Sequence, residues 1–263
     1  MGSTSGKAYV PTDFSANQTR FSLPLDNYVV DPFESEFAVN LLVQQCMRSA
    51  GLKWNIPPNS ASALPPTRNR VGRRLFNREL AAKYGYHSGP AQLPPSGQLN
   101  PVLTATQQPA FDKCAADANK RVGVDRQLRD LVESLQLAAY QAVKASPKFT
   151  ATTNEWKRCM TKAGFTDLTN FPDVMPSDAQ RRDFGLATQA DQVVSSIGSP
   201  SEIKQATIDA DCRESSGYAN FMYSTEVDNQ LRLMSQNADA MERARAARAA
   251  AMATIQAVLR GHA

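Results

Sequence analysis

Four cysteines are the residues whose spacing most clearly indicates chemistry, and two of them lie in copies of one short motif. Residues 45–52 read QCMRSAGL and residues 158–165 read RCMTKAGF, and each copy is followed later in the chain by one further cysteine. An even number of cysteines placed in repeated motifs favours disulfides formed in an oxidising compartment. Pairing by position joins Cys46 to Cys114 and Cys159 to Cys212, although three connectivities satisfy the sequence.

The same cysteines are poor candidates for a metal centre or a reactive thiol. Each motif ends a predicted helix, where the negative end of the helix dipole disfavours a thiolate. Neither motif contains a CxxC pair, and the chain has only two histidines, His87 and His262. We therefore expect no metal site and no cofactor.

A basic segment follows a loop that contains two proline pairs, and the sequence predicts that this basic segment is a helix. Its basic residues are Arg68, Arg70, Arg73, Arg74, Arg78 and Lys83. Guanidinium groups pair with anions, so Arg70, Arg73 and Arg74 are candidates for binding phosphate, teichoic acid or an acidic peptide. The alternative, which we favour, is a solvated helix face whose arginine stems pack on the body of the protein.

Aromatic side chains lie beside this segment. Tyr84, Tyr86 and His87 occupy a turn that contains glycine, and Trp54 follows the first cysteine motif. Such side chains can line a groove for a saccharide or peptide, or they can cap the core beneath the proline loop. His87 has no serine or carboxylate at a catalytic spacing, so we do not predict a catalytic role for it.

Carboxylates near Cys212 offer the remaining chemistry. The group consists of Asp209, Asp211, Glu214 and Glu226. A helix places residues three apart on one face, and paired carboxylates across a cleft can hydrolyse glycosides. The favoured alternative is ordinary surface charge paired with Arg213 or Lys204.

The elements that must position these residues are helices, because no segment alternates apolar and polar residues as strands do. We expect an all-α helical bundle with proline-rich loops, two disulfides and a long C-terminal helix. The expected parts are an extended arm over residues 1–32, a disulfide-bridged half over 33–147 and a second half over 148–263. One compact unit is the expected assembly of these parts.

Helix ends follow from local residue types. Gly51 and Gly164 each precede a hydrophobic residue, which is the pattern of the Schellman C-cap. Pro147 is expected to end one helix and Thr153 or Asn154 to start the next. Ser199 or Ser201 is expected to open a helical stretch over about 202–258, kinked near Gly217.

Bulk properties narrow the class of protein. The chain has 263 residues and a formal net charge of +4, which does not indicate a nucleic-acid partner. No span approaches the roughly 20 apolar residues that cross a bilayer. The first six residues have the features of neither a signal peptide nor an anchor and read as an added leader. If the protein is exported, its signal or lipid anchor has been removed.

Several segments together resemble a group of actinobacterial secreted proteins and lipoproteins that have no assigned biochemical function. The resemblance rests on residues 156–164, 202–212, 216–218, 23–26 (LPLD) and 84–86 (YGY), and it spans about residues 21–240. It implies export, a cell-envelope location and disulfide bonding. It carries over no catalytic residue.

We therefore expect an exported cell-envelope protein that binds a ligand or has a structural role without catalysis. Its contact surface would include Trp54, the arginine segment and residues 84–87, with an anionic envelope component or an envelope protein as partner. Peripheral membrane association would come through the removed lipid anchor. Two alternatives are an envelope hydrolase acting on glycan or peptide, and an accessory subunit of an export or signalling complex that docks through its basic, alanine-rich C-terminal helix.

Overall fold

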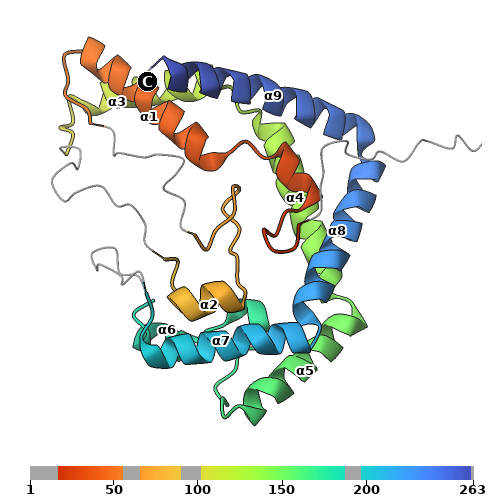
Figure 1. Ribbon diagram of the computed structural model, residues 1–263. Helices are drawn as coiled ribbons and strands as arrows, with labels where there is room; N and C mark the ends of the chain where they lie inside the picture. Colours follow the sequence, from red (N-terminus) through yellow and green to blue (C-terminus); the bar gives the residue numbers. More distant parts are fainter. Residues whose placement is uncertain (1–16, 56–65, 90–101, 187–196, 262–263) are drawn as a thin grey trace, which may run out of the picture. The chain divides into compact units, whose positions relative to one another are not determined.

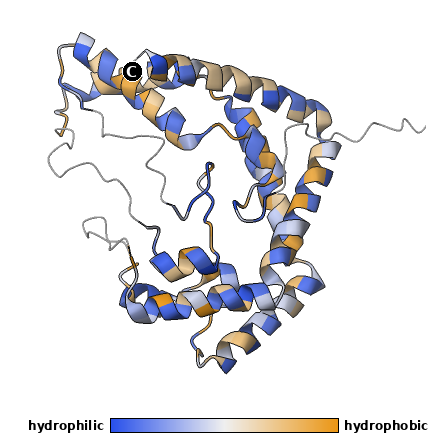
Figure 2. Ribbon diagram, in the orientation of Figure 1, coloured by the Kyte–Doolittle hydropathy of each residue, from blue (hydrophilic) through white to orange (hydrophobic). Residues whose placement is uncertain are grey.

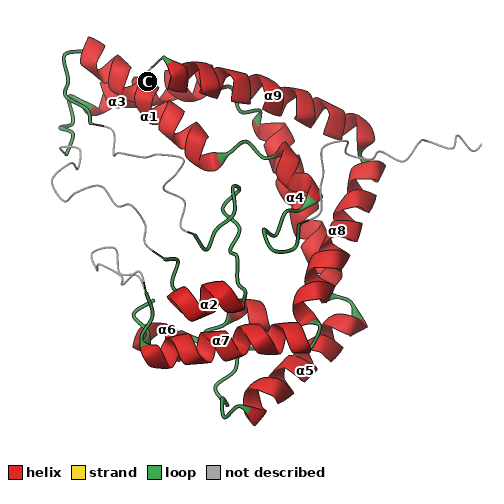
Figure 3. Cartoon of the chain, viewed as in Figure 1, coloured by secondary structure: helices red, strands yellow, loops and turns green. Residues whose placement is uncertain are grey.

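A computed structural model describes residues 17–55, 66–89, 102–186 and 197–261, and its described residues are helices joined by loops (Figure 3). Within these ranges the β-structure consists of two isolated bridges, so the all-α prediction is confirmed. The expected leader, the first proline pair at residues 57–58 and His262 lie outside the described residues. So does most of the expected arm, whose described part holds a β-bridge from Asn17 to Ser22 and a short 3-10 helix.

The helices have the following bounds in chain order (Figure 1): η1 Pro24–Tyr28, α1 Pro32–Ser49, α2 Arg78–Tyr84, α3 Gln108–Val122, α4 Arg126–Lys144, α5 Pro147–Lys162, η3 Pro172–Val174, α6 Asp178–Asp183, α7 Pro200–Ser215, α8 Tyr218–Gln236 and α9 Ala238–Arg260. The stretch expected as one kinked helix over 202–258 is thus three helices. Gly217 has a φ of +72° and separates α7 from α8, while Asn237 precedes α9. Ser199 caps α7 by accepting a hydrogen bond from the Glu202 amide, as predicted.

Both cysteine motifs end their helices as predicted. Gly51 and Gly164 have φ angles of +76° and +93°, which glycine adopts without the steric cost of a side chain. The Leu52 amide donates to the Met47 carbonyl at 2.9 Å, and the Phe165 amide makes the equivalent bond at 3.1 Å. These are the bonds of the Schellman motif.

Two further helix predictions were wrong. Pro147 starts α5, and Ser146 caps that helix by accepting from the Lys148 amide, so the helix begins before Thr153. Proline is well suited to the first helical position, where its missing N–H has no partner in any case.

The helix predicted over residues 68–83 covers only Arg78–Tyr84. Asn69 accepts bonds from the amides of Val71 and Arg73 and holds a tight turn, and the extended Asn77 caps α2. Asparagine side chains compete with the helical backbone in this way.

The chain divides into two compact units, and each contains one disulfide. Unit 1 draws its described residues from Met1–Pro24, Pro65–Ala91 and Leu135–Gln236, and unit 2 from Leu25–Leu64, Gln92–Ser134 and Asn237–Ala263. The disulfides join Cys46 to Cys114 and Cys159 to Cys212, which confirms the pairing by position. The units differ from the expected sequence halves, because the arginine segment belongs to unit 1 and α9 to unit 2.

Unit 2 is built on α1, α3 and α9. Its core includes Leu41 and Met47 of α1, Ala118 of α3, and Ile255 and Val258 of α9. Apolar and polar residues are interspersed along these helices, as expected for helices that bury one side (Figure 2). The apolar side of α9 is therefore part of this core.

Unit 1 packs α2 and α5 against α7, and α8 against α5 and α7. One core cluster surrounds Trp156 and Met160 of α5, and a second includes Phe221 and Met222 of α8. The Cys159–Cys212 disulfide joins α5 to α7 beside the first cluster. Among the helices of the described ranges, none has the length and apolarity that a bilayer crossing requires.

Candidate functional site

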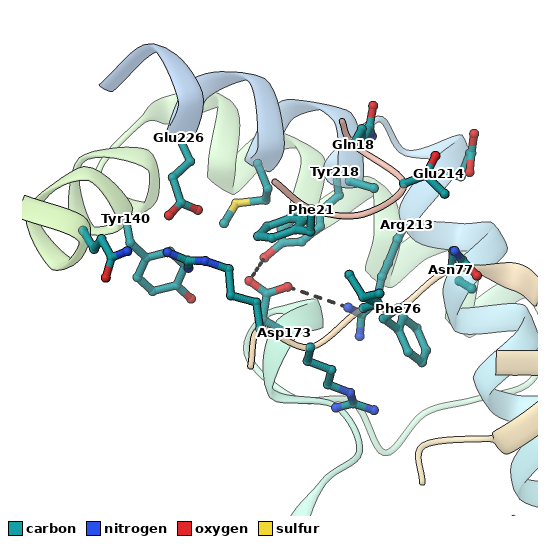
Figure 4. A pocket seen from close by; sticks show the side chains of 18 of the residues that line it. Gln18, Phe21, Phe76, Asn77, Tyr140, Asp173, Arg213, Glu214, Tyr218 and Glu226 are labelled. Atoms are coloured by element: carbon teal, nitrogen blue, oxygen red, sulfur yellow. Dashed lines mark hydrogen bonds and ion pairs between the residues drawn. The ribbon is translucent and has the colours of Figure 1, made fainter. Parts of the chain in front are cut away.

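Unit 1 contains a pocket of about 710 Å³ whose walls combine arginine, aromatic and carboxylate side chains (Figure 4). This volume lies within the range of small-molecule sites. The lining residues that matter for its chemistry are Phe21, Arg73, Arg74, Phe76, Tyr140, Asp173, Arg213, Glu214, Tyr218, Met222 and Glu226. They come from the arginine segment, α4, η3, α7 and α8, together with the chain that precedes η1.

The arginines of the basic segment take different positions. Arg73 and Arg74 line the pocket, whereas Arg70 is exposed and does not. Of the three arginines proposed as anion ligands, two are therefore placed at a concave site.

The aromatic candidates do not form the open groove considered above. Tyr84, Tyr86 and His87 are buried, at 4–5% exposure. Trp54 belongs to unit 2, where its ring packs on Phe111 with centroids 4.8 Å apart. These side chains pack within their own units. This agrees with the alternative stated above, that they cap the core and do not line a groove.

Asp209 is the centre of a buried polar network behind the pocket. Its carboxylate is fully buried and accepts bonds from Trp156 Nε1 at 2.8 Å and from the Tyr86 hydroxyl at 3.2 Å. Arg213 adds two bonds at 2.9 Å, one from Nε and one from Nη2. Burial and the Asp209 charge raise the pKa of Tyr86, so this phenol stays protonated as a donor. Burial acts to lower the pKa of Arg213, but Asp209 outweighs it and raises that pKa.

Glu202 forms a second buried contact, with the turn after α2. Its Oε1 accepts from the Tyr86 amide at 2.7 Å, and its Oε2 lies 3.2 Å from His87 Nε2. A side chain at Gly85 or Gly198 would collide with this carboxylate, because an added Cβ would lie 2.5 or 2.6 Å from its atoms. These contacts of Glu202 tie the turn after α2 to α7. His87 itself does not line the pocket.

The pocket brings a carboxylate into contact with phenols. The Tyr218 hydroxyl donates to Asp173 Oδ2 at 3.0 Å, and Arg213 Nη1 lies 3.7 Å from Asp173 Oδ1. Burial and the Asp173 charge raise the pKa of Tyr218, and the same two causes raise the pKa of Tyr140 to about 12. Both phenols therefore act at neutral pH as hydrogen-bond donors and not as bases or nucleophiles.

Arg74 contacts a backbone carbonyl and an aromatic ring in this site. Its Nη2 donates to the Tyr86 carbonyl at 3.2 Å, and its guanidinium lies over the Phe76 ring, 5.2 Å from the centroid. No carboxylate of the described residues forms an ion pair with it. Packing against the protein and the nearby charge of Arg213 lower the pKa of Arg74 to about 10, so it remains a cation at neutral pH.

The predicted carboxylates separate into three environments. Asp209 is the buried centre of the network, Asp211 pairs with Arg78 at the surface, and Glu214 and Glu226 line the pocket. Sequence reasoning missed Asp173 and Tyr218. A partial signal for Tyr218 was its position directly after Gly217, at the start of α8.

Comparison of the chain with protein-family models, with curated proteins and with solved structures gave no match. The described residues contain no group of three or more His, Cys, Asp or Glu side chains placed to hold a metal ion. The pocket and the disulfides are therefore the features that bear on function.

Proposed function

We propose that the protein is an exported cell-envelope binding protein, without catalytic activity, whose ligand occupies the pocket of unit 1. The observation that carries this proposal is the pocket of about 710 Å³ that combines Arg73 and Arg74 with aromatic walls. Pockets of this size with an apolar lining and a few fixed polar groups are the usual sites of small ligands.

The two disulfides support an extracytoplasmic compartment. Both cysteine pairs are oxidised, which is typical of proteins in extracytoplasmic, oxidising environments. We further propose that the protein is secreted or anchored at the cell surface. The resemblance to secreted proteins and lipoproteins supports this.

The walls of the pocket are fixed before a ligand arrives. Arg213 is held by Asp209 and by the Pro172 carbonyl, at 2.6 Å, and Tyr218 is held by Asp173. The Cys159–Cys212 disulfide lies one residue from Arg213 in sequence. A preorganised site loses less side-chain entropy on binding, which favours affinity.

A ligand-retention experiment tests this function. The protein is recovered from the envelope fraction of its own cells and examined by native mass spectrometry, alongside Ala219→Phe and Asn220→Phe. Ala219 lines the pocket, so a phenyl ring there should displace the ligand; Asn220 is an exposed neighbour on α8 and gives a matched control. We expect a stoichiometric added mass on the wild type and on Asn220→Phe, and none on Ala219→Phe. An added mass retained by Ala219→Phe, or none on any of the three proteins, would count against the proposal.

A hydrolase is the second candidate, because the pocket contains Asp173 in contact with Tyr218 and also contains Glu226. Paired carboxylates in a cleft can cleave glycosides. Turnover of fluorogenic glycan or peptide substrates by the wild type, abolished in both Asp173→Asn and Glu226→Gln, would favour this candidate over a pure binding protein.

A further inference from the structure

We infer that the pocket of unit 1 recognises a small aromatic molecule that carries one carboxylate, with the carboxylate on Arg74 and the ring system on the aromatic wall. The inference rests on the proposed binding function and names the chemical class of its ligand. The charge around Arg74 and the lining of the pocket support it independently.

Two guanidinium groups share one aromatic ring in this pocket. The Cζ atoms of Arg74 and Arg213 lie 5.2 and 4.3 Å from the centroid of Phe76. Arg213 pairs with Asp209 at 2.9 Å, whereas Arg74 feels the Asp209 charge only from beyond ion-pair distance and forms no ion pair with a described carboxylate. An anion beside Arg74 would relieve the repulsion between the two cations and add a charge-assisted hydrogen bond.

The hydrogen bond from Arg74 to the Tyr86 carbonyl leaves most of the Arg74 donors available. A guanidinium carries five N–H donors, and Arg74 uses one Nη2 contact, to the Tyr86 carbonyl. A planar carboxylate matches the remaining fork better than a neutral group does. Part of the Arg74 side chain reaches solvent, so a ligand can approach it from the pocket.

The rest of the lining favours an aromatic body. Phe21, Phe76, Tyr140, Tyr218 and Met222 supply ring faces and a thioether. Tyr218 is 1% exposed, with its hydroxyl committed to Asp173 and its ring against Phe149. The half-buried rings of Phe21, Phe76 and Tyr140 are therefore the ones that a ligand can reach. Aromatic pairs gain energy beyond simple burial of area.

The acidic side chains restrict the ligand to a single anionic end. Figure 4 shows Asp173 between Arg213 and Tyr140, with Glu226 on the Tyr140 side. A second carboxylate placed beside Asp173 would meet like charge. The expected ligand is therefore a monoanion with a neutral aromatic body.

The test uses the full-length protein with ¹³C-methyl methionine, because Met222 lines the pocket and its methyl signal reports directly on occupancy. The signal is assigned with Met222→Leu. Three probes are titrated: naphthoate, the uncharged naphthamide of the same shape, and glucuronate, which carries a carboxylate on a sugar. The variants are Arg74→Gln and the control Arg70→Gln, whose exposed arginine lies outside the lining.

We expect naphthoate to shift the Met222 signal saturably and to bind roughly tenfold or more tightly than naphthamide, since a hydrogen bond to a charged group is worth that much. Arg74→Gln should remove this preference and Arg70→Gln should keep it. The inference is overturned if naphthamide binds as well as naphthoate, if the preference survives in Arg74→Gln, or if glucuronate binds more tightly than naphthoate.

The inference and the proposed function fail in different ways. If no probe shifts the Met222 signal while the protein recovered from cells still carries a ligand that Ala219→Phe loses, the ligand class is wrong and the binding function stands. If the recovered protein carries no ligand and no probe binds, both are wrong.

Discussion

Replacing Asp209 with asparagine removes one charge from the buried network of unit 1 while keeping the size of the side chain. The wild-type carboxylate is fully buried and accepts bonds from Trp156, Tyr86 and Arg213. In the variant, the Arg213 guanidinium remains buried beside a neutral amide, and one amide N–H₂ group faces other donors. The network would lose both its charge balance and part of its hydrogen bonding.

The magnitude follows from the burial of both partners. The side chains of Asp209 and Arg213 are 0% and 11% exposed, and breaking a buried ion pair from one side costs about 3–5 kcal/mol. Asparagine keeps one acceptor oxygen, so we expect the lower end, about 3 kcal/mol. For a protein of this size that corresponds to a fall of roughly 6–12 °C in the melting temperature.

The assay is thermal and urea unfolding in a Trp54→Phe background. The chain has two tryptophans, so Trp156 then reports alone on unit 1. Asp211→Asn is the matched control on the same helix, because its ion pair with Arg78 is exposed and screened by water. An Asp209→Asn midpoint equal to that of Asp211→Asn would refute the idea that this network holds unit 1 together.

Three further predictions concern pH, covalent bonding and a helix end. Burial and a neighbouring carboxylate raise the pKa of Tyr140 to about 12 and also raise that of Tyr218. Phenols of the unfolded chain ionise at about pH 10, so unfolding above that pH releases protons. The free energy of unfolding should therefore fall as the pH rises from about 10 to about 12. Urea midpoints across this range should show a smaller fall in Tyr218→Phe, and an identical fall would contradict the assignment. Replacing Cys159 and Cys212 by serine frees a loop of 53 residues in the unfolded chain and should cost about 4 kcal/mol by urea unfolding; a loss below about 1 kcal/mol would show that the bridge contributes little. Gly164→Ala places a side chain at a φ of +93° with no steric neighbour and should cost about 1 kcal/mol in thermal unfolding, so an unchanged melting temperature would argue against this backbone conformation.

The features that the sequence predicted correctly depend on neighbours within a few residues. Gly51 and Gly164 end helices because a residue in the left-handed region is needed there, and the following hydrophobic residue folds back on the last turn. Ser199 caps a helix because its hydroxyl reaches an amide three residues on. The disulfide pairing was predicted from position, with two alternatives that only the folded chain excluded.

The pocket could not be predicted in the same way, because its residues lie far apart in the chain. Asp173 meets Tyr218 across 45 residues, and the Tyr86 hydroxyl meets Asp209 across 123. Each residue has an ordinary local role: Asp173 lies in a proline-started turn and Tyr218 begins a helix. Nothing in their spacing relates them, and only the packing of α5, α7 and α8 brings them together.

The arginine segment shows how one wrong helix prediction concealed the site. In a helix, residues 74 and 76 would point about 200° apart, because successive side chains rotate by about 100°. In extended chain, side chains two apart lie on the same side. The chain from Arg74 to Asn77 is not helical, Asn77 is extended, and the Arg74 guanidinium lies over the Phe76 ring. The asparagines that shorten the predicted helix, Asn69 and Asn77, thus allow an arginine and an aromatic ring to share one wall of the pocket. A candidate anion site in this protein exists because the basic segment is not the solvated helix that its composition favours.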